Sequence, residues 1–332
     1  MKTIFDVADE AGVSVVTVSR LMNNPAIVSA KTAEKIFRAM DKLNYQPSQI
    51  ARSLVGKSKN TIGVIMPDIK NTFFNSWFRF IEEYTGSHNI NLVLCNTDDD
   101  PAKEIKSIKL LQSQRVDGVI IAPYAIKSVE YLIKSNMCFI LFDRIFKELK
   151  TNFVTTDHYS GAYDAVEYLV RQGHTQIAVL KGPGILYADV QRYNAFVDVL
   201  HKHHIKVEKD FVVNCEFSEE LAIKAMRSLM QRRDKPTAIF TFSGLLTKGV
   251  IKYTQQMHLS IPNDISLIGF DEVPGQDIFF PQITHIVQSI NTLGKDIIVA
   301  IIDMIKNPGS KKQTRIFTKP KLVIGDSVKY LA

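Results

Sequence analysis

From Thr61 onward, short apolar runs alternate with longer stretches that have the spacing of amphipathic helices. The runs are Ile62–Met66, Leu92–Cys95, Gly118–Ala122, Phe139–Phe142, Ile177–Leu180, Ala238–Phe242 and Ile265–Ile268. Buried strands connected by helices form βαβ units, which make a parallel sheet covered on both faces. Nearly 270 residues of this pattern exceed one such sheet, so we expect an α/β core of two doubly wound lobes. A ligand would bind between the lobes, beyond the carboxyl ends of the strands.

The first 45 residues have a different pattern, which predicts a small all-α unit of three short helices. Thr3 is a suitable N-cap for the first helix, and Gly12 can adopt the positive φ that a tight turn needs. Ser14 caps the second helix, and the third begins at Ser29 or Lys31. The residues expected to pack inward are Ile4, Val7, Ala8, Ala11, Val18, Leu21, Ile36, Met40 and Leu43.

Pro47 separates this headpiece, residues 1–46, from a short segment at 47–60. The segment has room for one or two helical turns before a polar run, and helix nucleation is too costly for so short a helix to form alone. We expect it to be a hinge that folds only in contact with a partner. The core covers residues 61–327, with an N-lobe at about 61–157 plus 289–318 and a C-lobe at about 158–286 plus 319–327.

Basic residues are concentrated at the N-terminal end of the chain. The first 60 residues have nine Lys and Arg against five Asp and Glu, whereas the whole chain has a net charge of +7. A small basic end on a nearly balanced body is the charge distribution of a DNA-reading module attached to a neutral domain. A solvated charged face is the other interpretation of the charge alone.

Cysteine usage and the N-terminus indicate where the protein works. Cys95, Cys138 and Cys215 are far apart, which favours free buried thiols in a reducing cytosol. The N-terminus has acidic residues where a signal peptide needs an unbroken apolar stretch, and no apolar run approaches the ~20 residues of a membrane span. We therefore expect a cytoplasmic protein, associated with the nucleoid through DNA, with no membrane partner.

The run VADEAGVSVVTVSR, residues 7–20, has the components of a helix-turn-helix. Ala8 is small where two helices cross closely, Gly12 makes the turn, and Val18 packs beneath. Arg20 can donate two hydrogen bonds to a guanine. The other exposed side chains of the second helix suit phosphates (Ser14, Thr17 and Ser19) or base edges (Val15 and Val16). An ordinary αα-hairpin is the structural alternative.

The segment IFDVADEAGVSVVTVSRLMNNPAIVSAKTAEKIFRAMDKLNYQPSQIARSL resembles the headpiece and hinge of the lactose repressor (LacI/GalR) family of bacterial transcription regulators. Later blocks resemble the periplasmic-binding-protein-like core of that family: IGVIMPDIKNTFFN, LVLCNTDDDPAKE, RVDGVIIAP, LFDR, RQGHTQIAVLKGP, DISLIGFDEVP and PQITHIVQ. The resemblance extends from about Thr3 to Ser327. It implies a DNA-binding headpiece, a hinge helix and a two-lobed core that binds an effector.

The resemblance also implies which residues contact DNA. Leu54 corresponds to the apolar wedge of the hinge helix, which enters the minor groove. The cost of unstacking the base step there is offset by wider contact with the bent DNA. Packing against the core is the alternative for this side chain. The expected DNA-binding positions are Thr3, Ser14, Val15, Val16, Thr17, Ser19, Arg20, Asn23, Tyr45, Ala51 and Leu54.

A second set of positions is expected to bind the effector. These positions are Phe73, Phe74, Asp143, Asp157, Arg192, Ser243, Asp271 and Gln288. The aromatic rings can stack on a flat or ring-shaped ligand, and the arginine fork can bind hydroxyl or anionic oxygen. Helix capping is the alternative for acidic residues at strand ends.

Two departures from the family pattern concern the effector. Ser243-Gly244 stands where the family usually has an Asn-Asp pair, and the residues before Arg192 lack the polar partners of purine-binding members. A purine is therefore disfavoured, and we expect a sugar, sugar acid or sugar phosphate.

Other sites have weaker support in the sequence. Gly182-Pro183-Gly184 has no phosphate-binding pattern after it, so a tight turn is expected. His201, His203 and His204 favour a solvated helix end over a metal site, and the run at 98–100 favours a helix cap over a calcium site. We expect no metal, no cofactor and no enzyme activity.

These patterns together predict a repressor that binds a palindromic operator on double-stranded DNA as a homodimer, in a setting of carbohydrate metabolism. A small effector between the lobes would change their closure and, through it, the spacing of the two hinges. Control by a protein corepressor, such as a phosphorylated phosphocarrier, is one alternative. A sugar-binding protein without a DNA function is the other.

Overall fold

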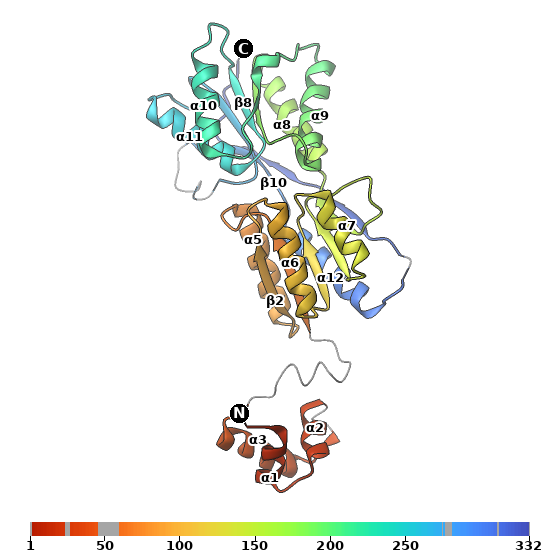
Figure 1. Ribbon diagram of the computed structural model, residues 1–332. Helices are drawn as coiled ribbons and strands as arrows, with labels where there is room; N and C mark the ends of the chain where they lie inside the picture. Colours follow the sequence, from red (N-terminus) through yellow and green to blue (C-terminus); the bar gives the residue numbers. More distant parts are fainter. Residues whose placement is uncertain are drawn as a thin grey trace. The chain divides into compact units, whose positions relative to one another are not determined.

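The computed structural model describes residues 2–23, 27–45, 60–273, 275, 281–310 and 312–331. The chain forms two units, Met1–Lys59 and Asn60–Ala332 (Figure 1). The expected DNA contacts Ala51 and Leu54 lie outside the described residues, as does most of the segment expected to be the hinge. Within the described ranges, no helix has the length and apolar character needed to cross a membrane.

The first unit contains three helices, α1 (Ile4–Ala11), α2 (Val15–Asn23) and α3 (Ala30–Leu43). A capping box starts α1, because Thr3 Oγ1 accepts a hydrogen bond from the Asp6 amide and the Asp6 carboxylate accepts one from the Thr3 amide. Gly12 ends the helix at φ 65°, in the left-handed region where a side chain is unfavourable. Ser14 and Ser29 start the next two helices by accepting from amides three residues on. The three predicted helices and their caps are confirmed.

A small apolar core holds this unit together. Its buried members are Val7, Ala8, Val18, Leu21, Ile36 and Ala39, and the predicted inward residues Ile4, Ala11, Met40 and Leu43 pack partly buried against them. The core therefore uses one side of α2 and leaves the other side exposed.

The second unit contains two six-stranded sheets (Figure 1). The N-lobe sheet has the order β11-β5-β4-β3-β1-β2 with all pairs parallel, and the C-lobe sheet has the order β12-β10-β9-β8-β6-β7 with only β10 and β12 antiparallel. The N-lobe strands are β1 (Thr61–Met66), β2 (Asn91–Asn96), β3 (Gly118–Ile121), β4 (Phe139–Phe142), β5 (Phe153–Thr156) and β11 (Arg315–Thr318). The C-lobe strands are β6 (Ile177–Lys181), β7 (Val212–Asn214), β8 (Ala238–Thr241), β9 (Ser266–Phe270), β10 (Thr284–Val287) and β12 (Lys321–Val323).

Helices cover both faces of each sheet, as parallel sheets require. In the N-lobe, α5 (Thr72–Gly86) and α12 (Ile290–Lys306) pack on one face, and α6 (Pro101–Ser113) and α7 (Ile126–Lys134) on the other. In the C-lobe, α8 (His158–Arg171) and α9 (Tyr187–Lys202) pack opposite α10 (Glu219–Met230) and α11 (Gly244–Gln256). A single 3-10 turn, Lys209–Phe211, precedes β7. The predicted fold of two doubly wound lobes is confirmed.

The chain crosses between the lobes three times: after β5, after β10 and after β11. Each lobe is thus completed by a returning segment, with α12 and β11 joining the N-lobe and β12 joining the C-lobe. Residues that follow β5 and β10 therefore lie where the two lobes meet.

Candidate functional site

A cavity of about 120 Å³ lies between the lobes, beyond the carboxyl ends of strands from both sheets. The expected effector positions that line it are Phe73, Phe74, Asp143, Arg192, Ser243, Asp271 and Gln288. Asp157 is not among the lining residues, because its carboxylate caps α8 by accepting a hydrogen bond of 3.1 Å from the Ser160 amide. Helix capping was the alternative to effector binding that we expected for acidic residues at strand ends.

Three of the lining aspartates, Asp99 at φ 56° and the two that follow strands directly, have strained backbones. Asp143 directly follows β4 with φ 61°, and Asp271 directly follows β9 with φ 71°. The left-handed region costs a non-glycine residue about 1–2 kcal/mol. Strain of this kind persists where the surrounding structure enforces it, and it is concentrated at functional sites.

Arg192 is the central cation of the C-lobe wall and is only 5% exposed. Its Nη1 donates to the Phe242 carbonyl at the end of β8, and its Nη2 lies 3.1 Å from His158 Nδ1. The guanidinium carbon lies 3.6 Å from the centre of the Phe270 ring, a cation–π contact. Its Nε is buried and has no hydrogen-bond partner among the described residues.

Asp143 faces the cavity from the N-lobe. Burial raises the pKa of this carboxyl, but the neighbouring His158, followed by Arg192 and Arg144, holds it below its ordinary value. Its Oδ1 lies 3.4 Å from His158 Nε2 and accepts no well-formed hydrogen bond from the residues described. Asp143 is therefore a buried carboxylate with an unused acceptor.

Gln288 joins the lobes at the second crossover. Its Oε1 accepts from Thr156 Oγ1 at the end of β5, and its Nε2 donates to Asp271 Oδ1 over 2.6 Å. Burial raises the pKa of Asp271 above its ordinary value, and the charge of Asp143 adds to the rise while Arg192 and Gln288 oppose it. The amide therefore fixes one carboxylate of the C-lobe against a strand of the N-lobe.

The aromatic wall belongs to the N-lobe. Phe73 stacks on Phe142 at a centroid distance of 5.8 Å, and Phe142 stacks in turn on Trp77 at 3.9 Å. Phe74 packs edge-on against Phe73 at 5.2 Å. These rings are buried in the N-lobe core, so the wall is rigid.

Ser243 and Gly244 form the start of α11 at the cavity. Ser243 Oγ accepts from the Leu246 amide at 3.4 Å and so acts as the N-cap. A Cβ at Gly244 would lie 2.8 Å from the Glu272 carbonyl oxygen, so only glycine fits this approach of the two strand ends. The departure from an Asn-Asp pair therefore goes with a tighter wall.

Further lining residues were missed in the sequence. Arg144, 8% exposed, forms an ion pair with Asp99 beside the ring of Phe74. Asp99 belongs to the predicted cap of α6, but Asp100 alone performs the capping, by accepting from two amides. Both missed residues follow the carboxyl ends of strands, which is the signal that identifies them. The remaining lining residues include Asp68, Asn71, Leu186, Ala188, Glu216, Phe217 and Leu245.

The charged side chains that line the cavity favour a ligand with hydrogen-bond donors and uncharged oxygens over an anionic ligand. Five carboxylates and two guanidinium groups line the cavity. Both guanidinium groups already have partners, Arg144 with Asp99 and Arg192 with Phe242 and His158. Among the residues described, no group of three His, Cys, Asp or Glu is placed to hold a metal ion.

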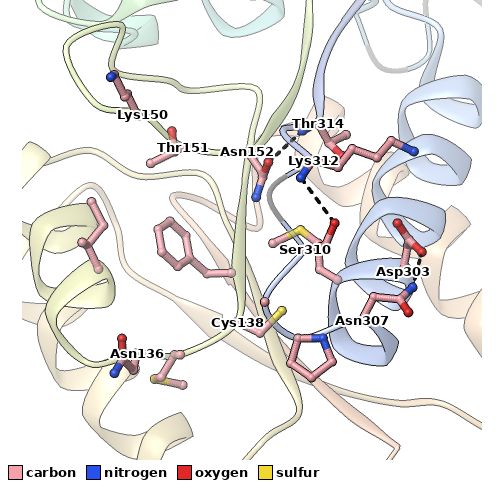
Figure 2. A pocket seen from close by; sticks show the side chains of 16 residues that line it. Asn136, Cys138, Lys150, Thr151, Asn152, Asp303, Asn307, Ser310, Lys312 and Thr314 are labelled. Carbon is pink, nitrogen blue, oxygen red and sulfur yellow. Dashed lines mark hydrogen bonds between the residues drawn. The ribbon is translucent and has the colours of Figure 1, made fainter.

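A larger cavity of about 400 Å³ lies at the opposite edge of the N-lobe sheet, at the amino ends of β4, β5 and β11 (Figure 2). Two of its hydrogen bonds, Asn307 Nδ2 to Asp303 and the Lys312 amide to Ser310, join near neighbours on one segment, and a third runs from the Thr314 amide to Asn152 Oδ1. The four residues of the first two bonds are exposed. Ligands of doubly wound sheets bind at the carboxyl ends instead, so the cavity between the lobes is the better candidate.

The expected DNA contacts on α2 lie on its exposed side. Val16 is 57% exposed, and Ser14 and Arg20 are also exposed. Val15, Thr17 and Ser19 are half-buried at the edge of this face, and Asn23 is the last residue of the helix. Thr3 caps α1, and Tyr45 packs half-buried against the core of the first unit.

Family comparisons match both units of the chain. The family model for bacterial regulatory proteins of the lacI family matches residues 3–48. The model for periplasmic binding proteins and the sugar binding domain of the LacI family matches residues 59–323.

Two curated relatives span nearly the whole chain. A ribose operon repressor of Halalkalibacterium halodurans is 34% identical over 99% of this chain and 98% of its own length. The transcriptional repressor PurR of Vibrio vulnificus is 32% identical over 99% of both chains.

Two solved structures also align with this chain. The Lac repressor dimer bound to operator and the anti-inducer ONPF aligns with a TM-score of 0.87 at 25% identity, covering 99% of both chains. A LacI family regulator of Enterococcus faecium with bound ribose aligns with a TM-score of 0.72 at 28% identity, covering 82% of this chain and all of the other. The relatives named here are transcriptional repressors and not enzymes. This chain belongs to the LacI family of bacterial DNA-binding transcriptional repressors, with a headpiece of the lacI type and a ligand-binding core.

Proposed function

We propose that this repressor binds a palindromic operator as a homodimer and is controlled by a small neutral sugar held between the lobes of its core. The observation that carries the effector proposal is a cavity between the lobes whose wall holds polar and charged side chains from both. Two of these residues also have a buried polar atom without a hydrogen-bond partner among the described residues, Asp143 Oδ1 and Arg192 Nε. Buried atoms of this kind cost stability, which is expected where side chains are arranged to bind a ligand.

The charges favour a neutral ligand over a sugar acid or sugar phosphate. Carboxylates outnumber guanidinium groups in the lining by five to two; Arg144 forms an ion pair with Asp99, and the charge of Arg192 is opposed by those of Asp271 and Asp143. An added anion would therefore face repulsion without a free cation to offset it. Among the three effector classes expected from the sequence, the neutral sugar fits best.

The size and the walls favour a monosaccharide. The cavity of about 120 Å³ is smaller than the roughly 300 Å³ at which pockets for drug-sized ligands begin. Phe73 offers an aromatic surface to the apolar face of a sugar ring, and Leu186 and Ala188 add no polar partner for a purine. The ribose in one structural neighbour and the name of the ribose operon repressor agree with this choice.

On the DNA side, we propose that α2 enters the major groove with its exposed face. Arg20 would form the bidentate base contact, Val15 and Val16 would contact base edges, and the hydroxyls would contact phosphates. Thr3, Asn23, Tyr45, Ala51 and Leu54 complete the proposed DNA contacts. A two-fold dimer matches a palindrome because each half-site then meets the same helix. Such a role places the protein in the cytoplasm.

The test is a selection of random duplexes bound by the full-length protein, repeated with D-ribose, other neutral monosaccharides, sugar acids and sugar phosphates. We expect a palindromic consensus whose affinity one neutral sugar changes about tenfold or more, roughly 1.4 kcal/mol of coupling. Arg20→Ala should cost about 1–3 kcal/mol of operator affinity and leave sugar binding unchanged. The effector proposal fails if only anionic compounds act, or if none does, which is the result expected for a protein corepressor.

A further inference from the structure

His158, the first residue of α8, is buried where the two lobes meet and contacts a functional side chain from each. Its Nδ1 lies 3.1 Å from Arg192 Nη2 in the C-lobe, and its Nε2 lies 3.4 Å from Asp143 Oδ1 at the end of β4. One imidazole ring therefore touches two residues of the cavity wall, one from each lobe.

These contacts determine which ring nitrogen carries the proton. Guanidinium nitrogens only donate, so Nδ1 facing Arg192 must be the bare acceptor. Nε2 then carries the proton and has two acceptors at 3.4 Å, Asp143 Oδ1 and Thr155 Oγ1. Thr155 gives its own hydroxyl proton to the Asp143 carbonyl over 2.7 Å, which leaves its lone pairs free to accept.

The surroundings favour the neutral ring. Burial lowers the pKa of His158 most, and the positive charge of Arg192 lowers it further, while Asp143 and Asp157 oppose them. A cation in the first turn of a helix is also disfavoured. The other groups packed near the ring are Phe270 and Tyr187, whose centroids lie 5.8 and 6.4 Å away. Beyond them, the charge of Arg144 lowers the pKa of Asp143, and the charge of Asp271 raises the pKa of Arg192.

We propose that neutral His158, protonated on Nε2, is a positioning residue of the effector site: it holds Asp143 of the N-lobe and Arg192 of the C-lobe in place at the wall of the cavity. The role rests on the proposed function, since these two residues are assigned to the bound sugar. Protonation of Nδ1 removes the acceptor for Arg192 and places a second positive charge beside it. Effector binding should therefore weaken as the pH falls through the pKa of this ring.

The first test needs no effector. The full-length protein labelled with ¹⁵N-histidine gives a long-range ¹H–¹⁵N spectrum of its eight histidines, and His158→Asn identifies the signal of residue 158. We expect a neutral ring with a bare Nδ1 at pH 7, titrating below the ordinary imidazole pKa of about 6.5. A charged ring at pH 7, or a proton on Nδ1, overturns the proposal.

The second test measures the affinity for D-ribose by calorimetry at about pH 7.5 and 5.5, on either side of the ordinary imidazole pKa of about 6.5. His158→Asn is the matched variant, because its amide oxygen takes the place of Nδ1 and accepts from Arg192 without titrating. We expect the wild-type affinity to fall at the lower pH, by less than tenfold because the pKa of the ring lies below its ordinary value, and the Asn variant to fall less. Asp271 titrates in both proteins, so the difference isolates residue 158.

His158→Phe keeps the ring but loses both polar contacts, and we expect it to bind ribose about tenfold more weakly at either pH. Wild-type affinity in the Phe variant, or the same pH profile in the Asn variant, would show that His158 serves the fold alone and would overturn the proposal. A wild-type protein that binds no ribose counts against ribose as the effector, and the histidine spectrum then decides the role of His158.

Discussion

The headpiece and the effector site hold their functional side chains in opposite ways. In α2 the expected contact residues lie on the exposed side of one short helix, and the residues that stabilise it, Val18 and Leu21, lie on the other side. In the core, the lining residues come from many separated segments between Pro67 and Gln288, and several of them are buried and bonded to each other. Within α2, Val16 and Arg20 thus lie apart from the residues that stabilise the helix, whereas the effector site uses the same residues for both purposes.

The largest expected effect comes from removing Arg192, which tests whether the effector site also stabilises the fold. In Arg192→Leu, the Phe242 carbonyl and His158 Nδ1 lose their donor, and Asp143 and Asp271 lose a buried countercharge. Removing one partner of a buried charge network costs about 3–5 kcal/mol, so we expect loss of that size in urea unfolding together with loss of sugar binding. Arg192→Lys, which keeps the charge, should lose less stability. A loss under about 1 kcal/mol would mean that the site is independent of the fold after all.

The two sides of α2 provide the next test. Leu21 is 1% exposed, and Leu21→Ala should destabilise the headpiece by about 2–5 kcal/mol. Val16 is 57% exposed, so Val16→Ala should leave stability within about 0.5 kcal/mol while it weakens operator binding. Amide hydrogen exchange of the full-length protein measures the first, and operator titration the second. If Val16→Ala destabilises the headpiece as Leu21→Ala does, contact and stability are not separated there.

The same contrast explains what could be predicted from the sequence. The headpiece depends on local signals, such as Thr3, Gly12 and Ser14 at the ends of helices, and these were confirmed. The apolar runs identified seven of the strands, including the edge strand β2, but β5, β7, β10, β11 and β12 were not among them. They have only three or four residues each and contain polar side chains, so periodicity alone does not distinguish them.

The effector site was predicted less completely, because its geometry comes from contacts between distant segments. The rule that ligands bind at the carboxyl ends of strands brought Asp143 and Asp271 together, and applied fully it would have included Asp99 and Arg144. The same rule could not tell that Asp157 caps α8 while its neighbour His158 faces both lobes. That distinction depends on the direction of single side chains, which spacing does not give.

Asp271→Asn tests whether a residue that serves sugar binding lowers the free energy of unfolding. The pKa of Asp271 is raised by burial, so its charged form is unfavourable in the folded protein and the contribution of this group to stability is lost as the pH rises through its folded pKa. Asparagine keeps an acceptor for Gln288 without the charge, and we expect a gain on the order of 1 kcal/mol at pH 7 with weaker sugar binding. The gain should shrink as the pH falls through the raised pKa. Equal stability of the two proteins at all pH values would contradict this.

The smallest expected effect concerns backbone strain at two left-handed positions, Gly12 in the headpiece and Asp143 in the core. The turn of the headpiece uses glycine at φ 65°, whereas the core places Asp143 at φ 61° and bears the cost, because a carboxylate is needed there. A Cβ at Gly12 would meet no atom within 4 Å, so Gly12→Ala adds only the left-handed conformation, at about 1 kcal/mol. Gly12→Asn should lose less, since asparagine tolerates this region, and hydrogen exchange of the headpiece amides measures both. Equal losses in the two variants would mean that the turn has a requirement other than φ.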